Sequence, residues 1–286
     1  AQNGNLTQKQ KLDYDTHAAT DIWNYNYTGH RVTSVTSSAL GGTRFQVGYD
    51  SAGNMTSKVD NGANLTKNME FTAENRINRV LNPATGEVVG DYKYDDQGFR
   101  VTKVARENIT PAETRVYELE MPNKYFALER QKDVNGNPIA HTEYAVNNVY
   151  LDGLRIAAVL PTGQARWFMT DQVDTVNLVL NDAGNAISTI DYLPFGETWY
   201  QSGDTGFSPK FNSQELDKES KHYFFNARHY DPELARFTSA DSVVDGMLNT
   251  QGWNAYAYAH NNPIRYKDPT GHFIEQILVA LVETAI

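Results

Sequence analysis

A repeat of about 22 residues constrains the fold of this chain more than any other feature of its sequence. The aromatic residues Tyr27, Tyr49, Phe71 and Tyr94 lead four units that stand 22, 22 and 23 residues apart. Each unit predicts a strand, a tight turn and a second strand, because apolar and polar residues alternate and Gly or Asn stands where φ can be positive. Such a hairpin cannot bury its apolar face alone, so we expect neighbouring units to stack in one sheet. A β-meander with accidental spacing is the alternative.

Composition excludes several classes of function. The formal net charge of −10 argues against a surface that binds nucleic acid, which needs a positive field. The absence of cysteine excludes thiolate nucleophiles, disulfides and Cys-ligated metals. No apolar run reaches the roughly 18 residues of a membrane-spanning helix. Tyr, at 17 residues, outnumbers Phe, at 12, which suits pleated strands.

The sequence predicts no metal site and no cofactor. Phosphate-cradling glycine loops and nucleophile elbows are absent. Four histidines of the last quarter lie near several aspartates, but no pair has the spacing of a metal site. They are His222, His229, His260 and His272. Asp50, Asp95 and Asp191 each stand beside a Tyr and are predicted to bond backbone amides in turns.

Several ordered motifs resemble one family. The word Tyr49-Asp-Ser-Ala-Gly-Asn54 resembles the YD repeats of Rhs proteins, Tc-toxin shell subunits and teneurins. The segment 167–197 is similar to the family hairpin that ends in a Tyr-x-Pro-Phe-Gly signature, here from Tyr192 to Gly196. The segments 211–237 and 254–271 resemble the opening and the end of the Rhs-associated core.

The resemblance implies a mainly β fold. In it, YD-repeat β-hairpins wind into a spiralling sheet that forms part of a hollow shell, with a mixed Rhs core plug and a short C-terminal helix. It divides the chain into a repeat shell at 1–206, the Rhs-associated core at 207–272, and an amphipathic tail at 273–286 that starts an effector region.

The tail has helical periodicity. Its apolar residues fall at i, i+3, i+4, i+7 and i+8, namely Ile274, Ile277, Leu278, Leu281 and Val282. One interpretation is a helix packed inside or against the shell. The other is the start of a longer hydrophobic segment that leads a toxin toward a membrane, and both stay open.

The resemblance also implies an intramolecular aspartic autoprotease. Many cores of this family cut themselves just after a terminal Asp-Pro-x-Gly-Leu word. Carried over to this sequence, the catalytic carboxylates are Asp241 and Asp268, the scissile bond is His272–Phe273, and Arg236 is the supporting cation. Two close carboxylates share a proton, so one can act as base and the other as acid.

Three departures from the family pattern bear on this activity. Ser242 stands where Pro is usual, His272 stands where Leu is expected, and the two aspartates are 27 residues apart, a longer spacing than in the bacterial pattern. In the alternative interpretation, Asp268 only opens a turn and Asp241 only caps a helix.

Two functions follow from the resemblance. The first is the end of an Rhs-type shell that encapsulates and delivers a C-terminal toxin or effector. Its partners are its own effector segment, the rest of the shell and proteins of a secretion machinery. The second is an uncleaved, teneurin-like adhesion or interaction module. Both predict a secreted or cell-surface protein.

Overall fold

The computed structural model describes residues 4–13, 15–110, 113–204, 206–207, 209–243, 250–272 and 274–276. Within them, seventeen strands form one antiparallel sheet in which each strand pairs with the next along the chain. The strands are β1 (Gln8–Leu12), β2 (Ala19–Thr28), β3 (Arg31–Ser37), β4 (Gly42–Tyr49), β5 (Met55–Asp60), β6 (Leu65–Phe71), β7 (Ile77–Leu81), β8 (Val88–Tyr94), β9 (Arg100–Thr110), β10 (Glu113–Asn123), β11 (Phe126–Lys132), β12 (Tyr144–Leu151), β13 (Leu154–Val159), β14 (Ala165–Thr170), β15 (Val176–Leu180), β16 (Ala186–Tyr192) and β17 (Thr198–Gly203). The predicted stacking of hairpins in one mainly β sheet is confirmed.

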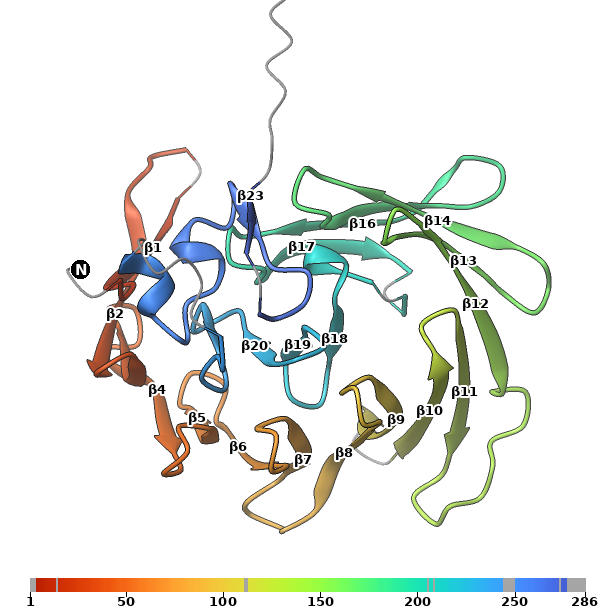
Figure 1. Ribbon diagram of the computed structural model, residues 1–286, viewed down its shortest axis with the longest axis horizontal. Coiled ribbons are helices and arrows are strands. Elements are labelled where there is room, and N and C mark those ends of the chain that lie inside the picture. The colour runs from red at the N-terminus through yellow and green to blue at the C-terminus, as the bar shows by residue number, and fades with distance from the viewer. Residues whose placement is uncertain are drawn as a thin grey trace, which may run out of the picture.

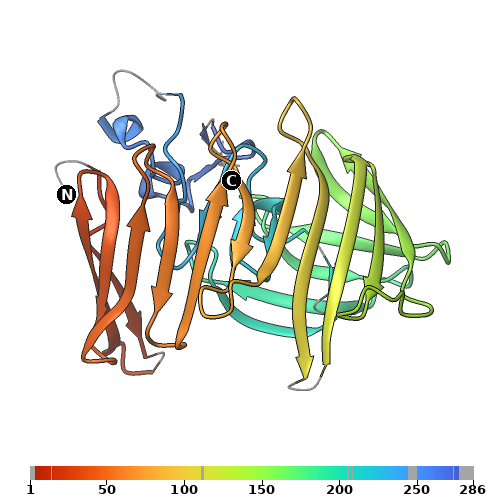
Figure 2. The same ribbon diagram turned by 90° about the horizontal axis from the view of Figure 1, so that it is seen from below.

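The sheet curls into a wall around a central space (Figure 1). Seen from the side, neighbouring strands run side by side across the wall, and their hairpin turns lie along its two edges (Figure 2). The lead aromatics Tyr27, Tyr49, Phe71 and Tyr94 pack against the buried cluster on the inner side of the early strands. The hydroxyl of Tyr94 also donates a hydrogen bond of 2.6 Å to the carbonyl of Ile77. The aromatic period therefore lines the inside of the wall.

The turn after each YD word has one hydrogen-bonding pattern. At Asp50 the backbone N–H donates to the carbonyl of Asn54 (3.0 Å), and the N–H of Gly53, with φ of 90°, donates back to the carbonyl of Asp50 (3.2 Å). The Asp50 carboxylate accepts from the N–H of Asn54 at 2.8 Å. Gly at the fourth position relieves the strain of a positive φ, as in a hairpin closed by a bulge. The same pair of backbone bonds recurs at 72–76, 95–99, 133–137, 160–164, 171–175, 181–185 and 193–197.

The prediction for Asp191 was wrong. Asp191 lies in β16 opposite Tyr200 rather than in a turn, because the turn in this repeat begins two residues later, at Leu193. Asp95, in contrast, bonds the backbone N–H of Phe99 at 2.8 Å as predicted.

A smaller set of elements fills the space inside the wall (Figure 1). It contains the strands β18 (Glu215–Asp217), β19 (His222–Phe224), β20 (His229–Asp231) and β21 (Arg236–Phe237), which form a second sheet, the pair β22 (Tyr266–Lys267) and β23 (Glu275–Gln276), and the 3-10 turns η1 (Phe211–Ser213), η2 (Thr250–Trp253) and η3 (Ala259–Asn261). We call these elements the core. Its centre is aromatic, with the rings of Tyr230 and Tyr258 4.7 Å apart. The wall ends with β17 at Gly203 and the second sheet begins with β18 at Glu215, and the division of the chain into domains at 206/207 stays a prediction.

Acidic side chains of the core meet basic side chains of the wall. Arg100, on β9, contacts Asp217 and Glu215, each at 2.7 Å, and Lys103 lies 2.6 Å from Asp217. The Asp217 side chain is fully buried. Burial alone would raise the pKa of this carboxyl, but Arg100 and Lys103 hold it well below its usual range. The core is thus fixed to the wall by buried ion pairs.

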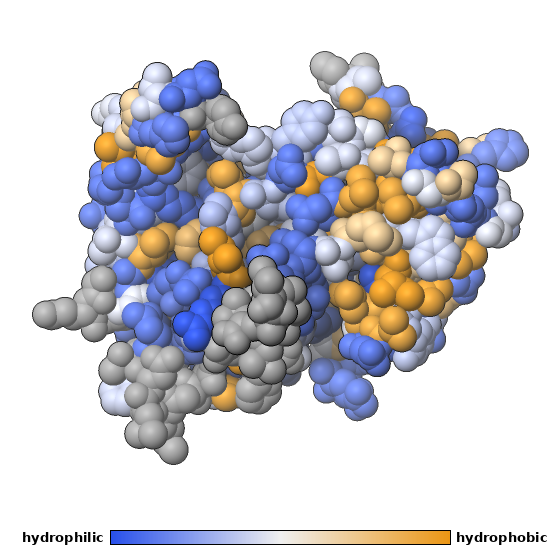
Figure 3. All heavy atoms as spheres, turned by 90° about the horizontal axis from the view of Figure 1, so that it is seen from above, coloured by the Kyte–Doolittle hydropathy of each residue, from blue (hydrophilic) through white to orange (hydrophobic). Residues whose placement is uncertain are grey.

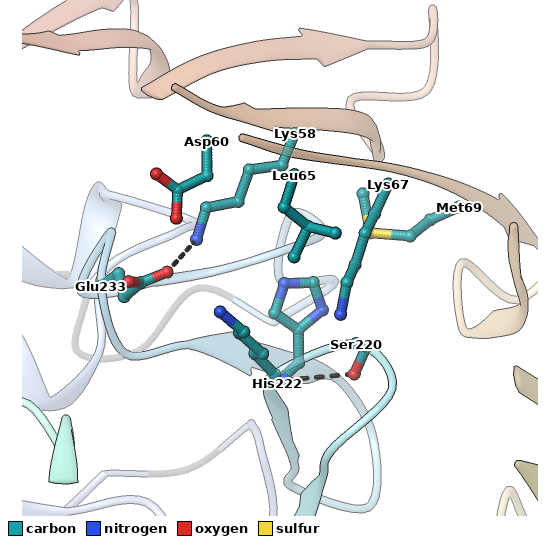
Figure 4. A pocket seen from close by; sticks show the side chains of 9 residues that line it. Lys58, Asp60, Leu65, Lys67, Met69, Ser220, His222 and Glu233 are labelled. Carbon is teal, nitrogen blue, oxygen red and sulfur yellow. Dashed lines mark hydrogen bonds and ion pairs between the residues drawn. The ribbon is translucent and has the colours of Figure 1, made fainter. Parts of the chain in front are cut away.

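A second group of ion pairs joins the core to the wall. Lys58, on β5, contacts Asp231 and Glu233 of the core, each at 2.7 Å. Figure 4 shows Lys58 reaching across a small cavity to Glu233, with His222 and Lys67 at its edge. The cavity volume is about 20 Å³, so the core and the wall are closely packed here.

The outer face of the wall is apolar over β12–β15. Val149 lies opposite Ala157, which lies opposite Trp167, so these residues share one face. Leu151 is 60% exposed and Trp167 and Met169 are about 40% exposed. Figure 3 shows apolar side chains gathered on this side of the molecule. The wall is therefore apolar on both faces here, because Phe168 points into the buried inner cluster.

The expected helix at the C-terminus is wrong where the structure describes the tail. Glu275 and Gln276 form β23 and pair with Lys267 and Tyr266. The strand pairing satisfies the backbone groups that a helix would satisfy internally. Residues 273 and 277–286, on which the rest of this prediction falls, lie outside the described residues. Along the described chain, no helix combines the length and apolarity that crossing a membrane requires.

We predict that Asp217→Asn lowers the free energy of unfolding by about 3–5 kcal/mol, because it leaves Arg100 buried without its strongest partner. The measurement is urea denaturation followed by tyrosine and tryptophan fluorescence. The control is Asp91→Asn, which removes the half-exposed ion pair with Arg79 and should cost less than about 1 kcal/mol. Equal losses in the two variants would show that the buried pair does not fix the core.

Candidate active site

Asp241 and Asp268 meet at one guanidinium group. Asp241 Oδ2 lies 2.7 Å from Arg228 Nη2, and Asp268 Oδ2 lies 3.6 Å from the same nitrogen. The two aspartates come from segments on either side of η2 and η3. The structure thus brings together the two carboxylates that the sequence predicted.

Arg228 is held in place by the aromatic centre of the core. It follows the turn after β19, where the N–H of Phe225 donates to its carbonyl at 2.9 Å. Its guanidinium carbon lies 3.7 Å from the centroid of the Phe237 ring. It also donates to the carbonyls of Ala255, at 3.0 Å, and Gly271. Burial lowers the pKa of Arg228 to about 10, although the two aspartates act in the opposite direction. One cation therefore ties three segments of the core together.

Asp268 opens the turn that precedes the predicted scissile bond. Its Oδ1 accepts from the backbone N–H of Gly271 (2.8 Å) and Thr270 (3.2 Å). Its Oδ2 is buried and has no hydrogen-bond partner among the described residues. Burial raises the pKa of this carboxyl, the charge of Asp241 adds to the increase, and Arg228 opposes it. Asp268 is thus suited to carry a proton.

Asp241 has a different environment. Its Oδ1 accepts from the N–H of Val243 at 2.9 Å and lies 2.8 Å from His272 Nδ1, while its Oδ2 faces Arg228. Its own N–H donates to the carbonyl of Ala255 at 2.8 Å. Donors therefore face both oxygens of Asp241, and its surroundings differ from those of the more deeply buried Asp268.

Gly271 is required by the local geometry. Its φ is 80°, and a Cβ on this residue would lie 2.5 Å from the carbonyl oxygen of Phe225. The carbonyl of Pro269, two residues before Gly271, accepts from the side-chain amides of Gln214 (3.2 Å) and Asn226 (3.3 Å). The Asp-Pro-Thr-Gly turn is therefore fixed against the core at its buried ends, Asp268 and Gly271, while Thr270 is exposed.

A small cavity lies between these groups. Asp241, Asp268, Arg228, His260 and His272 contribute to its lining, and its volume is about 20 Å³. A cavity of this size with polar walls has room for one water molecule. The arrangement can place a water beside both carboxyl groups.

Comparison with known proteins agrees with the fold. Residues 155–264 match the model of the family described as Teneurin YD-shell. The crystal structure of TcdB2-TccC3-Cdc42 superposes with a TM-score of 0.68 at 17% identity, over 95% of this chain and 14% of that one. In fold, the chain is therefore a YD-repeat shell.

Curated relatives of this YD-repeat protein carry diverse names. It is 23% identical over 222 residues to the tRNA3(Ser)-specific nuclease WapA of Bacillus spizizenii, covering 75% of this chain and 9% of WapA. It is 28% identical over 198 residues to salivary gland surface protein 1 of Aedes aegypti, covering 67% of this chain and 6% of that protein. It is 25% identical over 245 residues to double-stranded DNA deaminase toxin A of Burkholderia cenocepacia, covering 78% and 16%. The chain spans less than a fifth of the length of each of these relatives.

The cation at the aspartates of this YD-repeat protein is Arg228 and not Arg236, the residue proposed from the sequence. Arg236 lies in β21 and points to the wall, where its Nη2 lies 3.3 Å from the Tyr27 hydroxyl and 3.5 Å from Asn5 Oδ1. The sequence feature that could have indicated Arg228 was its position in the segment 223–232, part of the motif that resembles the opening of the Rhs-associated core. Phe273 lies outside the described residues. No group of three or more His, Asp or Glu residues in the described chain is placed to hold a metal ion.

We predict that the carboxyl group of Asp268 in the uncleaved chain has a pKa above the ordinary aspartate value of 3.8. The measurement is a pH titration in which carbon-13 NMR follows the chemical shift of its carboxyl carbon. The folded state then favours the protonated form, so the stability that this group contributes below pH 3.8 is lost as the pH rises through the raised pKa. Asp13 is the comparison, because hydrogen bonds from Thr16 lower its pKa. Asp268 titrating with or below Asp13 would contradict the assignment of Asp268 as the acid.

Proposed function

We propose that this chain is the C-terminal part of a shell that encloses a C-terminal effector and releases it by cutting the His272–Phe273 bond. The curved wall and the core seated inside it support enclosure (Figure 1). Two of the similar proteins are named as a nuclease and a DNA deaminase toxin, which supports an effector as the cargo. The partners are the effector segment itself, the rest of the shell and a secretion machinery, and the protein acts outside the cell that makes it.

The cleavage step uses Asp241 as base and Asp268 as acid. Asp241 takes a proton from a water in the cavity, and the water oxygen attacks the carbonyl carbon of His272 while Asp268 donates its proton to the carbonyl oxygen. The carbon–nitrogen bond to Phe273 then breaks. The leaving nitrogen receives the proton held by Asp241, and Asp268 recovers a proton from the hydroxyl of the intermediate. Both carboxyl groups return to their starting states.

One observation carries this proposal. Two carboxyl groups in different surroundings line one water-sized cavity beside the Asp-Pro-Thr-Gly turn: Asp268 Oδ2 is buried, without a hydrogen bond and 3.6 Å from Arg228, whereas Asp241 accepts hydrogen bonds on Oδ1. Arg228 holds both at fixed positions, and an intramolecular substrate needs no further binding surface. A pair of purely structural aspartates would not need this asymmetry.

The second candidate is an uncleaved interaction module at the cell surface. The match to the Teneurin YD-shell family favours it. In this function the two aspartates and Arg228 only join segments of the core.

The test is the mass of the chain purified from cells. Under denaturing conditions we predict a break between His272 and Phe273, and under native conditions the fragment stays with the shell that encloses it. Asp241→Asn and Asp268→Asn should slow cleavage by about 10²- to 10⁴-fold and leave one chain. Asp182→Asn, which changes an aspartate in an outer turn, should be cut like the unchanged protein. One uncut mass for the unchanged protein would favour the interaction module.

A further inference from the structure

His272 contacts the carboxylate that the proposed cleavage uses as its base. Its imidazole Nδ1 lies 2.8 Å from Asp241 Oδ1, and its side chain is 30% exposed while that of Asp241 is 10% exposed. The same residue supplies the carbonyl of the proposed scissile bond. The leucine found at this place in the family word has no polar atom with which to make such a contact.

We propose that His272 restrains Asp241, so that the charge of the residue before the scissile bond controls when cleavage occurs. This inference rests on the proposed self-cleavage. It makes His272 a positioning residue that acts through Asp241.

The restraint follows from the hydrogen bonds of Asp241. Oδ2 is occupied by Arg228, and Oδ1 is shared by the N–H of Val243 and the imidazole of His272. A carboxylate takes a proton from water only through an oxygen that the water can reach. Removing the imidazole frees one acceptor position on Oδ1 of Asp241, and both residues line the cavity.

The charge of the imidazole sets the strength of the restraint. An imidazolium holds a carboxylate more strongly than a neutral imidazole does, because the attraction between opposite charges adds to the hydrogen bond. Among the described residues, the other charged or titratable groups that line the cavity beside this pair are Arg228, from the turn after β19, Asp268, after β22, and His260, from η3. Acidic conditions therefore favour the restrained state, and a rise in pH releases Asp241.

The experiment compares leucine, asparagine and histidine at position 272. The chain is synthesised in a cell-free system and diluted into buffers of about pH 5 and about pH 8, where imidazole changes its charge. The cleaved fraction is followed over time by denaturing mass spectrometry. His272→Leu removes the donor, and His272→Asn places a neutral amide donor near the position of Nδ1. His141→Gln, in an exposed turn, is the control for loss of a histidine.

We expect His272→Leu to be cut at least about tenfold faster than the unchanged chain near pH 5, with a smaller difference near pH 8. His272→Asn should be slower than His272→Leu by a factor that is the same at both pH values. Rates and pH profiles that coincide for His272→Leu and the unchanged chain, or a slower His272→Leu, would overturn the inference and leave the proposed cleavage intact. If no variant is cut at either pH, the proposed cleavage itself is wrong, and the inference fails with it.

A spectroscopic readout separates restraint from simple packing. In Asp268→Asn, which we expect to stay uncut, nitrogen-15 NMR should show the proton of the His272 imidazole on Nδ1. In the double variant with Asp241→Asn this preference should disappear. If the imidazole proton stays on Nδ1 in the double variant, the contact with Asp241 on which the restraint depends is contradicted.

Discussion

The buried contact between Arg100 of the wall and Asp217 of the core is the interaction on which the rest of the structure depends. Both side chains are almost completely buried, and neither charge could remain inside without the other. Lys103 and Lys58 extend the same arrangement, so acidic groups of the core face basic groups of the wall. The charge pattern gives the core one orientation within the curved sheet.

The candidate active site follows from that orientation. Phe237 is part of the aromatic centre of the core and carries the guanidinium of Arg228 on its ring. Arg228 in turn reaches Asp241, Asp268 and the turn at Gly271. The surroundings of the two aspartates differ: burial raises the pKa of Asp268, whereas Asp241 accepts from Val243 and faces Arg228. A water-sized cavity between them completes an arrangement with the parts of an aspartic protease.

The sequence predicted the parts of this structure that depend on local pattern. The turn at Asp50 follows from its Gly and its repeat, and the importance of Asp241 and Asp268 followed from family motifs. The choice of Arg236 failed because nearness in sequence was taken for nearness in space, whereas β21 directs that side chain to the wall. Arg228 reaches the site through tertiary packing alone. The helical period of the tail was overridden, where described, by strand pairing with β22.

Hydrogen exchange measured by mass spectrometry tests most directly whether the site depends on the seating of the core in the wall. We predict that backbone amides of 222–231 and 268–271 exchange slowly and together with those of β5–β9. In Asp217→Asn, these core amides should lose protection together, while β11–β13, on the far side of the wall, keep theirs. Unchanged protection of 268–271 in that variant would show that the two aspartates are held without the buried ion pairs, and it would contradict the account.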